Sequence, residues 1–161
     1  MNVIDTVSAN RSPATASGAD ALGKLPEWNL ADLYSSIDAP QLKDDITRAA
    51  AMAEDFEKRW RGTLEAEARK GTAGGLGLAV RQFEEIEELM GRIGSFAGLV
   101  YAGDTSDPNR VKLYGDVQEK LTDAGTHLIF FGLELNNIPD ETLAAALDAD
   151  PAFGHYRPWV E

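Results

Sequence analysis

The sequence predicts an all-α protein, an antiparallel up-down bundle of three long helices with short helices at its N- and C-terminal ends. Apolar residues recur at alternating steps of three and four in three stretches, and this period places each set on one side of a helix. Short Gly-, Asp-, Asn- and Pro-containing segments separate the stretches, which favours antiparallel neighbours. The three sets are Leu42, Ile46, Ala49, Ala53, Phe56 and Trp60; Phe83, Ile86, Met90, Ile93, Ala97 and Val100; and Tyr114, Val117, Leu121, Ala124, Leu128, Phe131 and Leu135.

The chain divides into two parts. Residues 1–24 are rich in Ser, Ala, Thr and Asp and lack a period, so this segment is expected to be disordered or frayed. Residues 25–161 are expected to form the folded domain. Its first element is predicted at Trp28–Tyr34, a short helical turn capped by Asn29. The apolar side chains expected to anchor this segment to the bundle are Trp28, Leu30, Leu33 and Tyr34.

The first two long helices are bounded by a cap and a glycine-rich segment. The first is predicted to start between Asp38, its N-cap, and Pro40 in its first turn, and to run to about Arg69. The segment Gly71–Gly75 ends it, and the second helix follows over about 76–102.

The remaining helices carry clear start signals. Asp107 is the expected N-cap of the third long helix, with Pro108 at its first position, and this helix is predicted to run to about Leu135. Asp140 is the expected cap of a short fourth helix that ends near Leu147.

The composition describes an acidic chain that suits a single domain. Its 161 residues include 27 Asp or Glu and 15 Lys or Arg, a formal net charge of −12. Binding to nucleic acid or to an anionic membrane is not expected, because both need clustered Lys and Arg. The chain has no cysteine, and we expect neither a signal peptide nor a membrane span. A cytoplasmic location is therefore predicted.

Candidate metal and acid–base groups have simpler structural interpretations. Asp123 and His127 are one helical turn apart, but two ligands make a poor zinc site, so His127 is expected to flank the core of the third helix. His155 is expected to be structural as well. An acidic run lies between Arg81 and Arg92 and is expected to form a solvated charged face. Its members are Glu84, Glu85, Glu87 and Glu88.

Two further features leave alternatives open. Gly91, Gly94 and Gly98 share one side of the second helix, and each costs about 1 kcal/mol relative to Ala, so something is expected to pack closely there. That contact is either a tight helix crossing within the domain or a hinge or contact with another part of a larger protein. Phe130, Phe131 and the tail Tyr156–Val160 place apolar residues on more than one side, which indicates a second surface covered by a partner.

Several short motifs occur in an order and spacing that are more specific than any one of them. They are Leu25–Tyr34, Gly94-Ser95-Phe96, Tyr101, Asp104-Thr105, Asp107-Pro108, Phe130–Leu135 and Tyr156–Trp159. Together they resemble the opening part of the oligoendopeptidase F-type zinc metallopeptidases, which are relatives of thimet oligopeptidase. Asn29 replaces the more usual Asp of that family, and Phe96 stands where Tyr is common.

The resemblance implies that residues 25–161 are the N-terminal helical lobe of a longer, zinc-dependent oligopeptidase. In that family a downstream domain carries His-Glu-x-x-His and a further Glu, which bind zinc, and zinc polarises the water that attacks the peptide. This chain has no such motif, so no catalytic, cofactor-binding or metal-binding residue is assigned to it. The implied partners are its own C-terminal catalytic domain and short peptide substrates, and the fragment alone is expected to be inactive and to self-associate.

The residues bear differently on two other functions. A stand-alone acidic helical protein-interaction module would explain the apolar stripes, the acidity and the lack of a catalytic set equally well. A carboxylate-bridged metal bundle is disfavoured because no Glu-x-x-His occurs.

Overall fold

The computed structural model describes residues 28–71 and 74–160, and the regular elements in these ranges are helices, with no strand among them. The prediction of an all-α protein is confirmed. The expectation for residues 1–24, and the first three residues of the motif at Leu25–Tyr34, lie outside the described residues. The helices in these ranges are α1 (Pro40–Trp60), α2 (Leu64–Ala68), α3 (Leu76–Gly103), α4 (Pro108–Thr126), α5 (Ile129–Leu135), α6 (Asp140–Ala149), α7 (Pro151–Gly154) and α8 (Arg157–Val160).

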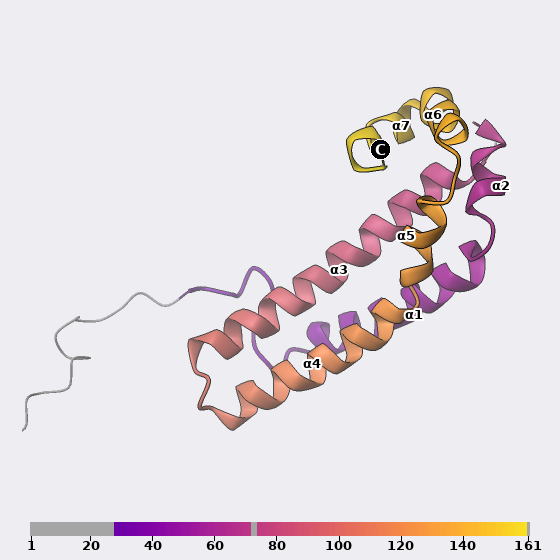
Figure 1. Cartoon of the computed structure of the whole chain (residues 1–161). Coiled ribbons are helices and arrows are strands. Elements are labelled where there is room, and N and C mark those ends of the chain that lie inside the picture. The colour runs from indigo at the N-terminus through magenta and orange to yellow at the C-terminus, as the bar shows by residue number, and fades with distance from the viewer. Residues whose placement is uncertain (1–27, 72–73, 161) are drawn as a thin grey trace, which may run out of the picture.

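The three longest helices form the body of the molecule. α1, α3 and α4 lie side by side, and each pair is in contact, whereas α5, α6, α7 and α8 gather at the end of α3 nearest α2 (Figure 1). None of the helices in the described ranges has the length and apolar character needed to cross a membrane.

The core is divided between the two ends of these long helices. At one end, buried Leu42, Ile93 and Val117 from the three helices belong to the same cluster as Tyr34. At the other end, Phe56 and Trp60 of α1 pack with residues of the short helices, including Phe131. The predicted apolar stripes therefore supply both parts of the core, and the short helices extend the second part.

The first long helix ends earlier than predicted. α1 stops at Trp60, and Gly62 adopts φ = +79°, a left-handed conformation that interrupts the helix before α2 begins. The Thr63 hydroxyl donates to the Trp60 carbonyl at 2.7 Å, and a carboxylate oxygen of Glu134 accepts from the Gly62 N–H at 2.7 Å. The resulting change of direction buries Leu64 at the junction with the short helices.

The third long helix is also shorter than predicted. α4 ends at Thr126, and α5 starts at Ile129 after a tight turn in which the His127 N–H donates to carbonyls of the preceding turn. The Thr126 hydroxyl donates to the Asp123 carbonyl at 2.7 Å, which gives a hydrogen-bond partner to a carbonyl in the last turn of α4. The interruption allows the adjacent rings of Phe130 and Phe131 both to enter the core.

The predicted caps are correct where the acid stands directly at the helix boundary. A carboxylate oxygen of Asp107 accepts from the Asn109 N–H at 2.8 Å, with Pro108 as the first residue of α4, as predicted. Asp38 is not the cap of α1, because buried Ala39 occupies that position and makes no side-chain cap bond. Asp140 is not a cap either, since it is the first residue of α6, which extends to Ala149.

Candidate functional site

The segment before α1 is held against the bundle by a buried polar contact. The Tyr34 hydroxyl donates to the Asp45 carboxylate at 2.9 Å, and Arg92 donates to the Leu33 carbonyl at 2.6 Å while its guanidinium lies 4.8 Å from the Tyr34 ring centroid. Burial, followed by the neighbouring Asp45, raises the pKa of Tyr34 to about 12. The predicted anchoring role is correct for Tyr34, but Trp28 is 77% exposed and does not anchor the segment.

Asn29 makes the predicted local cap, although the element that follows is a turn. Its side-chain oxygen accepts from the Ala31 N–H at 3.1 Å, and the N–H groups of Leu33 and Tyr34 both donate to the Leu30 carbonyl. The short helical turn predicted here is therefore a hydrogen-bonded turn rather than a helix.

His127 pairs with a carboxylate from another helix. Its Nδ1 lies 2.5 Å from a carboxylate oxygen of Glu57, and Arg61 also contacts that carboxylate. The hydrogen bond with His127, more than the charge of Arg61, lowers the pKa of Glu57. Within the described residues the His127 ring bonds to Glu57 and makes no hydrogen bond to the Asp123 side chain. His155 is exposed, with its ring 3.9 Å from that of Tyr156.

The residues that are described do not fit the zinc ion implied by the resemblance. No group of three His, Cys, Asp or Glu side chains lies together in the described ranges. The pair made by His127 and Glu57 has no third ligand, and two ligands make a poor zinc site. No catalytic step through a metal is therefore derived for this chain.

The acidic run on α3 is exposed to solvent over its whole length. Within the described ranges, Glu84 alone among these acids makes a hydrogen bond, which it accepts from the hydroxyl of Tyr156 in the C-terminal tail. Arg92 turns toward Leu33 instead of these carboxylates, and Arg81 makes no ion pair with them in the part of the chain described. The exposure of the four acids agrees with the predicted solvated face. They are Glu84, Glu85, Glu87 and Glu88.

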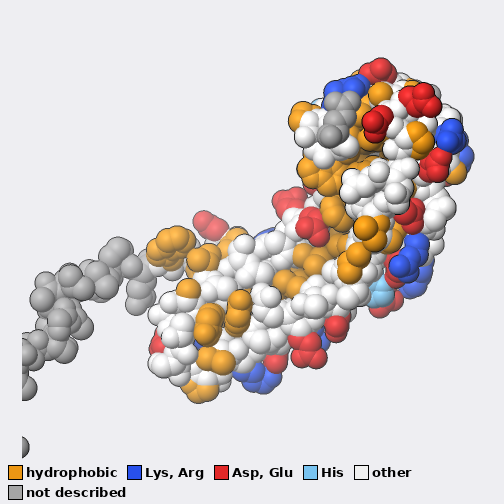
Figure 2. All heavy atoms as spheres, in the orientation of Figure 1, with side chains coloured by type: hydrophobic (Ala, Val, Ile, Leu, Met, Phe, Trp, Pro, Cys, Tyr) orange, Lys and Arg blue, Asp and Glu red, His pale blue; other side chains and the backbone are white. Residues whose placement is uncertain are grey.

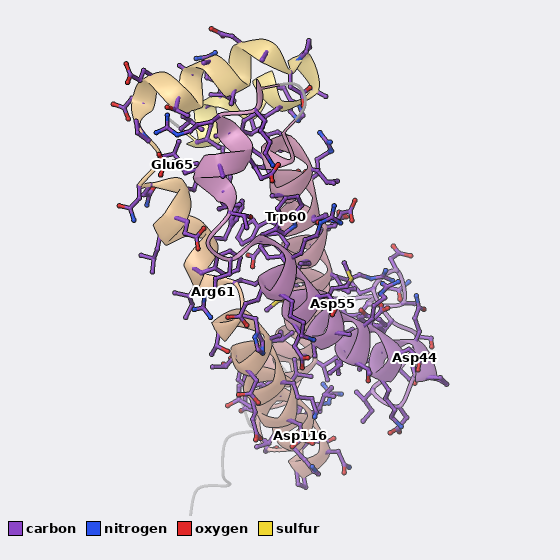
Figure 3. The ribbon with its side chains drawn as sticks, turned by 90° about the vertical axis from the view of Figure 1, so that its right-hand side faces the viewer. Asp44, Asp55, Trp60, Arg61, Glu65 and Asp116 are labelled. Atoms are coloured by element: carbon purple, nitrogen blue, oxygen red, sulfur yellow. The ribbon has the colours of Figure 1, made fainter. Side chains whose placement is uncertain are left out.

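Acidic residues also cover the outside of other helices. Figure 3 shows Asp44 and Asp55 of α1, Glu65 of α2 and Asp116 of α4, all of them exposed. The negative charge is thus spread over the surface instead of being collected in one site.

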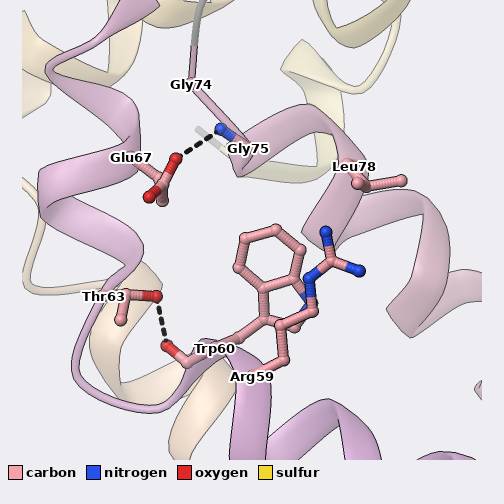
Figure 4. A pocket seen from close by; sticks show the side chains of 7 residues that line it. All are labelled: Arg59, Trp60, Thr63, Glu67, Gly74, Gly75 and Leu78. Carbon is pink, nitrogen blue, oxygen red and sulfur yellow. Dashed lines mark hydrogen bonds between the residues drawn. The ribbon is translucent and has the colours of Figure 1, made fainter.

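A shallow polar pocket lies where α1, α2 and α3 meet (Figure 4). Its volume is about 310 Å³. A carboxylate oxygen of Glu67 accepts from the Gly75 N–H at 2.7 Å, and the Lys70 ammonium lies 2.6 Å from the same carboxylate. These contacts give the Glu67 carboxylate its hydrogen-bond partners and join α2 to the start of α3. The pocket is therefore interpreted as a by-product of helix packing and not as a binding site. Its lining residues are Arg59, Trp60, Thr63, Glu67, Gly74, Gly75 and Leu78.

The three glycines of α3 have different surroundings. A Cβ atom on Gly94 would lie 3.3 Å from Leu121 of α4, and one on Gly98 would lie 4.0 Å from the Tyr114 ring. A Cβ atom on Gly91 would meet nothing within 4 Å. Gly94 and Gly98 thus face the crossing of α3 and α4, whereas Gly91 is exposed and has no packing role in the described structure.

The term exposed apolar face denotes three large exposed side chains at this end of the molecule, Ile129 and Leu133 of α5 and Trp159 of α8. Half-buried Phe83 of α3 contacts Trp159. The exposed fractions of Ile129, Leu133 and Trp159 are 62%, 61% and 54%. The Trp159 ring lies 6.0 Å from Phe83 and 6.4 Å from Phe131, measured between centroids. Figure 2 shows hydrophobic side chains gathered over α5 and its junction with α3, below the C-terminal helices.

This face differs from the one expected from the sequence. Phe130 and Phe131 are buried in the domain, and the aromatic exposure comes from Trp159 in the tail. Ile129 and Leu133 were not recognised from the sequence. The available signal was their spacing, because apolar residues four apart lie on one side of a helix and these two fall outside the main apolar stripe.

Comparisons with known protein families, with curated proteins and with solved structures find no match to this chain.

Proposed function

We propose that this chain is the noncatalytic N-terminal lobe of a zinc-dependent oligopeptidase that hydrolyses short peptides. The lobe would form one wall of the substrate channel and limit the size of the substrate, while its own C-terminal catalytic domain would bind zinc and cleave the peptide. A cytoplasmic location is part of this proposal. The observation that carries it is the exposed apolar face, because more than half of each of three large apolar side chains is open to solvent.

The placement of the family-like motifs supports the proposal. Tyr34 and Phe96, from two separate motifs, make an edge-to-face contact with ring centroids 5.1 Å apart. Phe131 and Trp159, from two others, stack at 6.4 Å. Residues that carry the resemblance therefore meet in the fold, as expected if the motifs specify one packed lobe.

The scaffold of the proposed lobe is an antiparallel up-down bundle of three long helices. Mutual contacts among α1, α3 and α4 and the short connection between α3 and α4 favour this topology. Gly94 and Gly98 would then serve as a close crossing of α3 and α4 instead of a hinge.

The chain purified alone should contain no stoichiometric zinc and should not cleave peptides. Elemental analysis would measure zinc, and a quenched fluorescent peptide library would measure cleavage with and without added zinc. Zinc-dependent cleavage by this chain alone would refute the assignment as a noncatalytic lobe.

The alternative is a stand-alone acidic helical protein-interaction module. The same exposed face and the net charge of −12 favour it. The gene downstream of codon 161 separates the two functions: a His-Glu-x-x-His motif in the same reading frame supports the peptidase lobe, and an immediate stop codon supports the module.

A further inference from the structure

We propose that the exposed apolar face binds an amphipathic segment of a partner protein whose apolar side is flanked by Lys and Arg. The inference rests on the proposed function only in requiring that another protein surface covers this face. It holds equally for a peptidase lobe and for an interaction module, because it concerns the chemistry of the partner and not catalysis.

The apolar part of the face has the properties of a docking site. Ile129 and Leu133 are one helical turn apart, so they present a continuous side of α5. Trp159 is backed by Phe83 and Phe131 of the core, with the ring of Phe131 nearly parallel to its own at 21°. Large aromatic anchors supported in this way contribute much of the energy of protein interfaces.

The charges next to the face favour a basic partner. Glu87 is exposed and lies one turn after Phe83 on α3, so it is the acidic neighbour of Phe83 on the helix surface. Glu87 and its exposed neighbours Glu85 and Glu88 form no ion pair or hydrogen bond within residues 28–71 and 74–160. On the other side, Arg61 lies 5.7 Å from the Phe130 ring but is paired with Glu57. Arg81 is also on this stretch of α3, and its Nη1 has no hydrogen-bond partner within the described residues. One guanidinium against the four carboxylates of Glu84, Glu85, Glu87 and Glu88 leaves the stretch with a negative net charge, which complements Lys and Arg.

A second copy of this chain is a poorer occupant. Two copies meeting through this face would bring their α3 carboxylates together, and like charges at an interface oppose association. Each copy has a net charge of −12, so the repulsion extends beyond the contact itself. A basic segment turns the same charges into attraction.

Peptide titration of the full chain tests this proposal. The probe is a fluorescently labelled helical peptide of Leu and Lys in an amphipathic pattern, followed by fluorescence anisotropy at about 50 mM NaCl. Binding is expected, weakening as NaCl is raised. The variant Ile129→Ser with Leu133→Ser should lose about tenfold in affinity, and Glu87→Lys with Glu88→Lys should also lose about tenfold.

Matched controls separate this face from general attraction to an acidic protein. Val111→Ser removes another exposed apolar side chain, and Glu119→Lys reverses an exposed charge on α4, and both should retain affinity within about threefold. A peptide of Leu and Glu with the same pattern should not bind. Circular dichroism would confirm that each variant is folded.

The proposal is overturned if the Leu and Lys peptide does not bind at about 100 µM, or binds the Ile129→Ser, Leu133→Ser variant unchanged. Equal binding of the Leu and Glu peptide also overturns it. A tight dimer at low salt that the same double variant abolishes would assign the face to a second copy instead. None of these measurements uses peptidase activity, so failure here is distinct from failure of the peptidase assignment.

Discussion

Tyr34 and Asp45 form the main buried polar contact between the N-terminal segment and the bundle. Asp45 is 5% exposed, and it also pairs with the exposed guanidinium of Arg48 at 2.9 Å. Burying a carboxylate costs free energy unless it is hydrogen-bonded. Tyr34 supplies the donor through its hydroxyl and fills the same site with its ring. This contact therefore determines where the chain before α1 attaches.

Replacing Tyr34 with Phe should lower the free energy of unfolding by about 1–2 kcal/mol near pH 7, because Asp45 loses a buried donor while the ring remains. Urea unfolding followed by circular dichroism would measure this change. Tyr101→Phe is the matched control, since Tyr101 stacks on Tyr114 at 4.8 Å and its hydroxyl makes no hydrogen bond within the described residues. An equal loss in both variants would contradict the role given to the Tyr34 hydroxyl.

The same pair also predicts how stability depends on pH in the alkaline range. The folded chain holds the Tyr34 proton up to a pKa of about 12, whereas the unfolded chain releases it around its ordinary value of 10. The unfolded state therefore binds fewer protons between these values, and stability should fall by about 1.4 kcal/mol per pH unit as the pH rises through them. Tyr34→Phe should show a shallower loss than the parent chain, and an unchanged slope would contradict the assignment.

Helix boundaries set by neighbouring residues can be predicted from the sequence, whereas boundaries set by contacts between distant residues cannot. Asp107 and Pro108 marked the start of α4 correctly, because a cap and a first-turn proline act within a few residues. The end of α1 was missed, because the continuing stripe gave no sign that Gly62 would turn left-handed and bond to Glu134, 72 residues away. The apolar face was missed in part for the same reason, since Trp159 meets Phe83 only after the tail folds back.

The predicted caps of α1 and α4 can be tested directly, because the structure contains the cap at Asp107 and not the one at Asp38. Asp107→Ala should destabilise the chain by about 1 kcal/mol, because the Asn109 N–H loses its acceptor. Asp38→Ala should change stability by less than about 0.5 kcal/mol, since Asp38 is exposed and the cap position belongs to Ala39. Urea unfolding would measure both, and a larger effect at Asp38 would reinstate the cap predicted from the sequence.

For the whole molecule, apolar exposure and net charge act in opposite directions. Ile129, Leu133 and Trp159 favour association, while a net charge of −12 on 161 residues keeps copies apart at low salt. Added salt shortens the range of the repulsion from about 10 Å at 0.1 M to about 3 Å at 1 M and leaves the apolar contact intact. The isolated chain should therefore self-associate through this face most strongly at high salt.

Sedimentation velocity at about 0.05 M and about 0.5 M NaCl tests this expectation, and the weight-average mass should rise with salt at constant protein concentration. The Ile129→Ser, Leu133→Ser variant is the control, and it should remain a monomer under both conditions because it keeps the charge but loses the apolar contact. A mass that falls with salt would mean that ion pairs hold the copies together, contrary to the charge distribution described above. Opposite salt dependences for self-association and for binding of a basic peptide would show that one face, with acidic neighbours on α3, discriminates between the two occupants by charge.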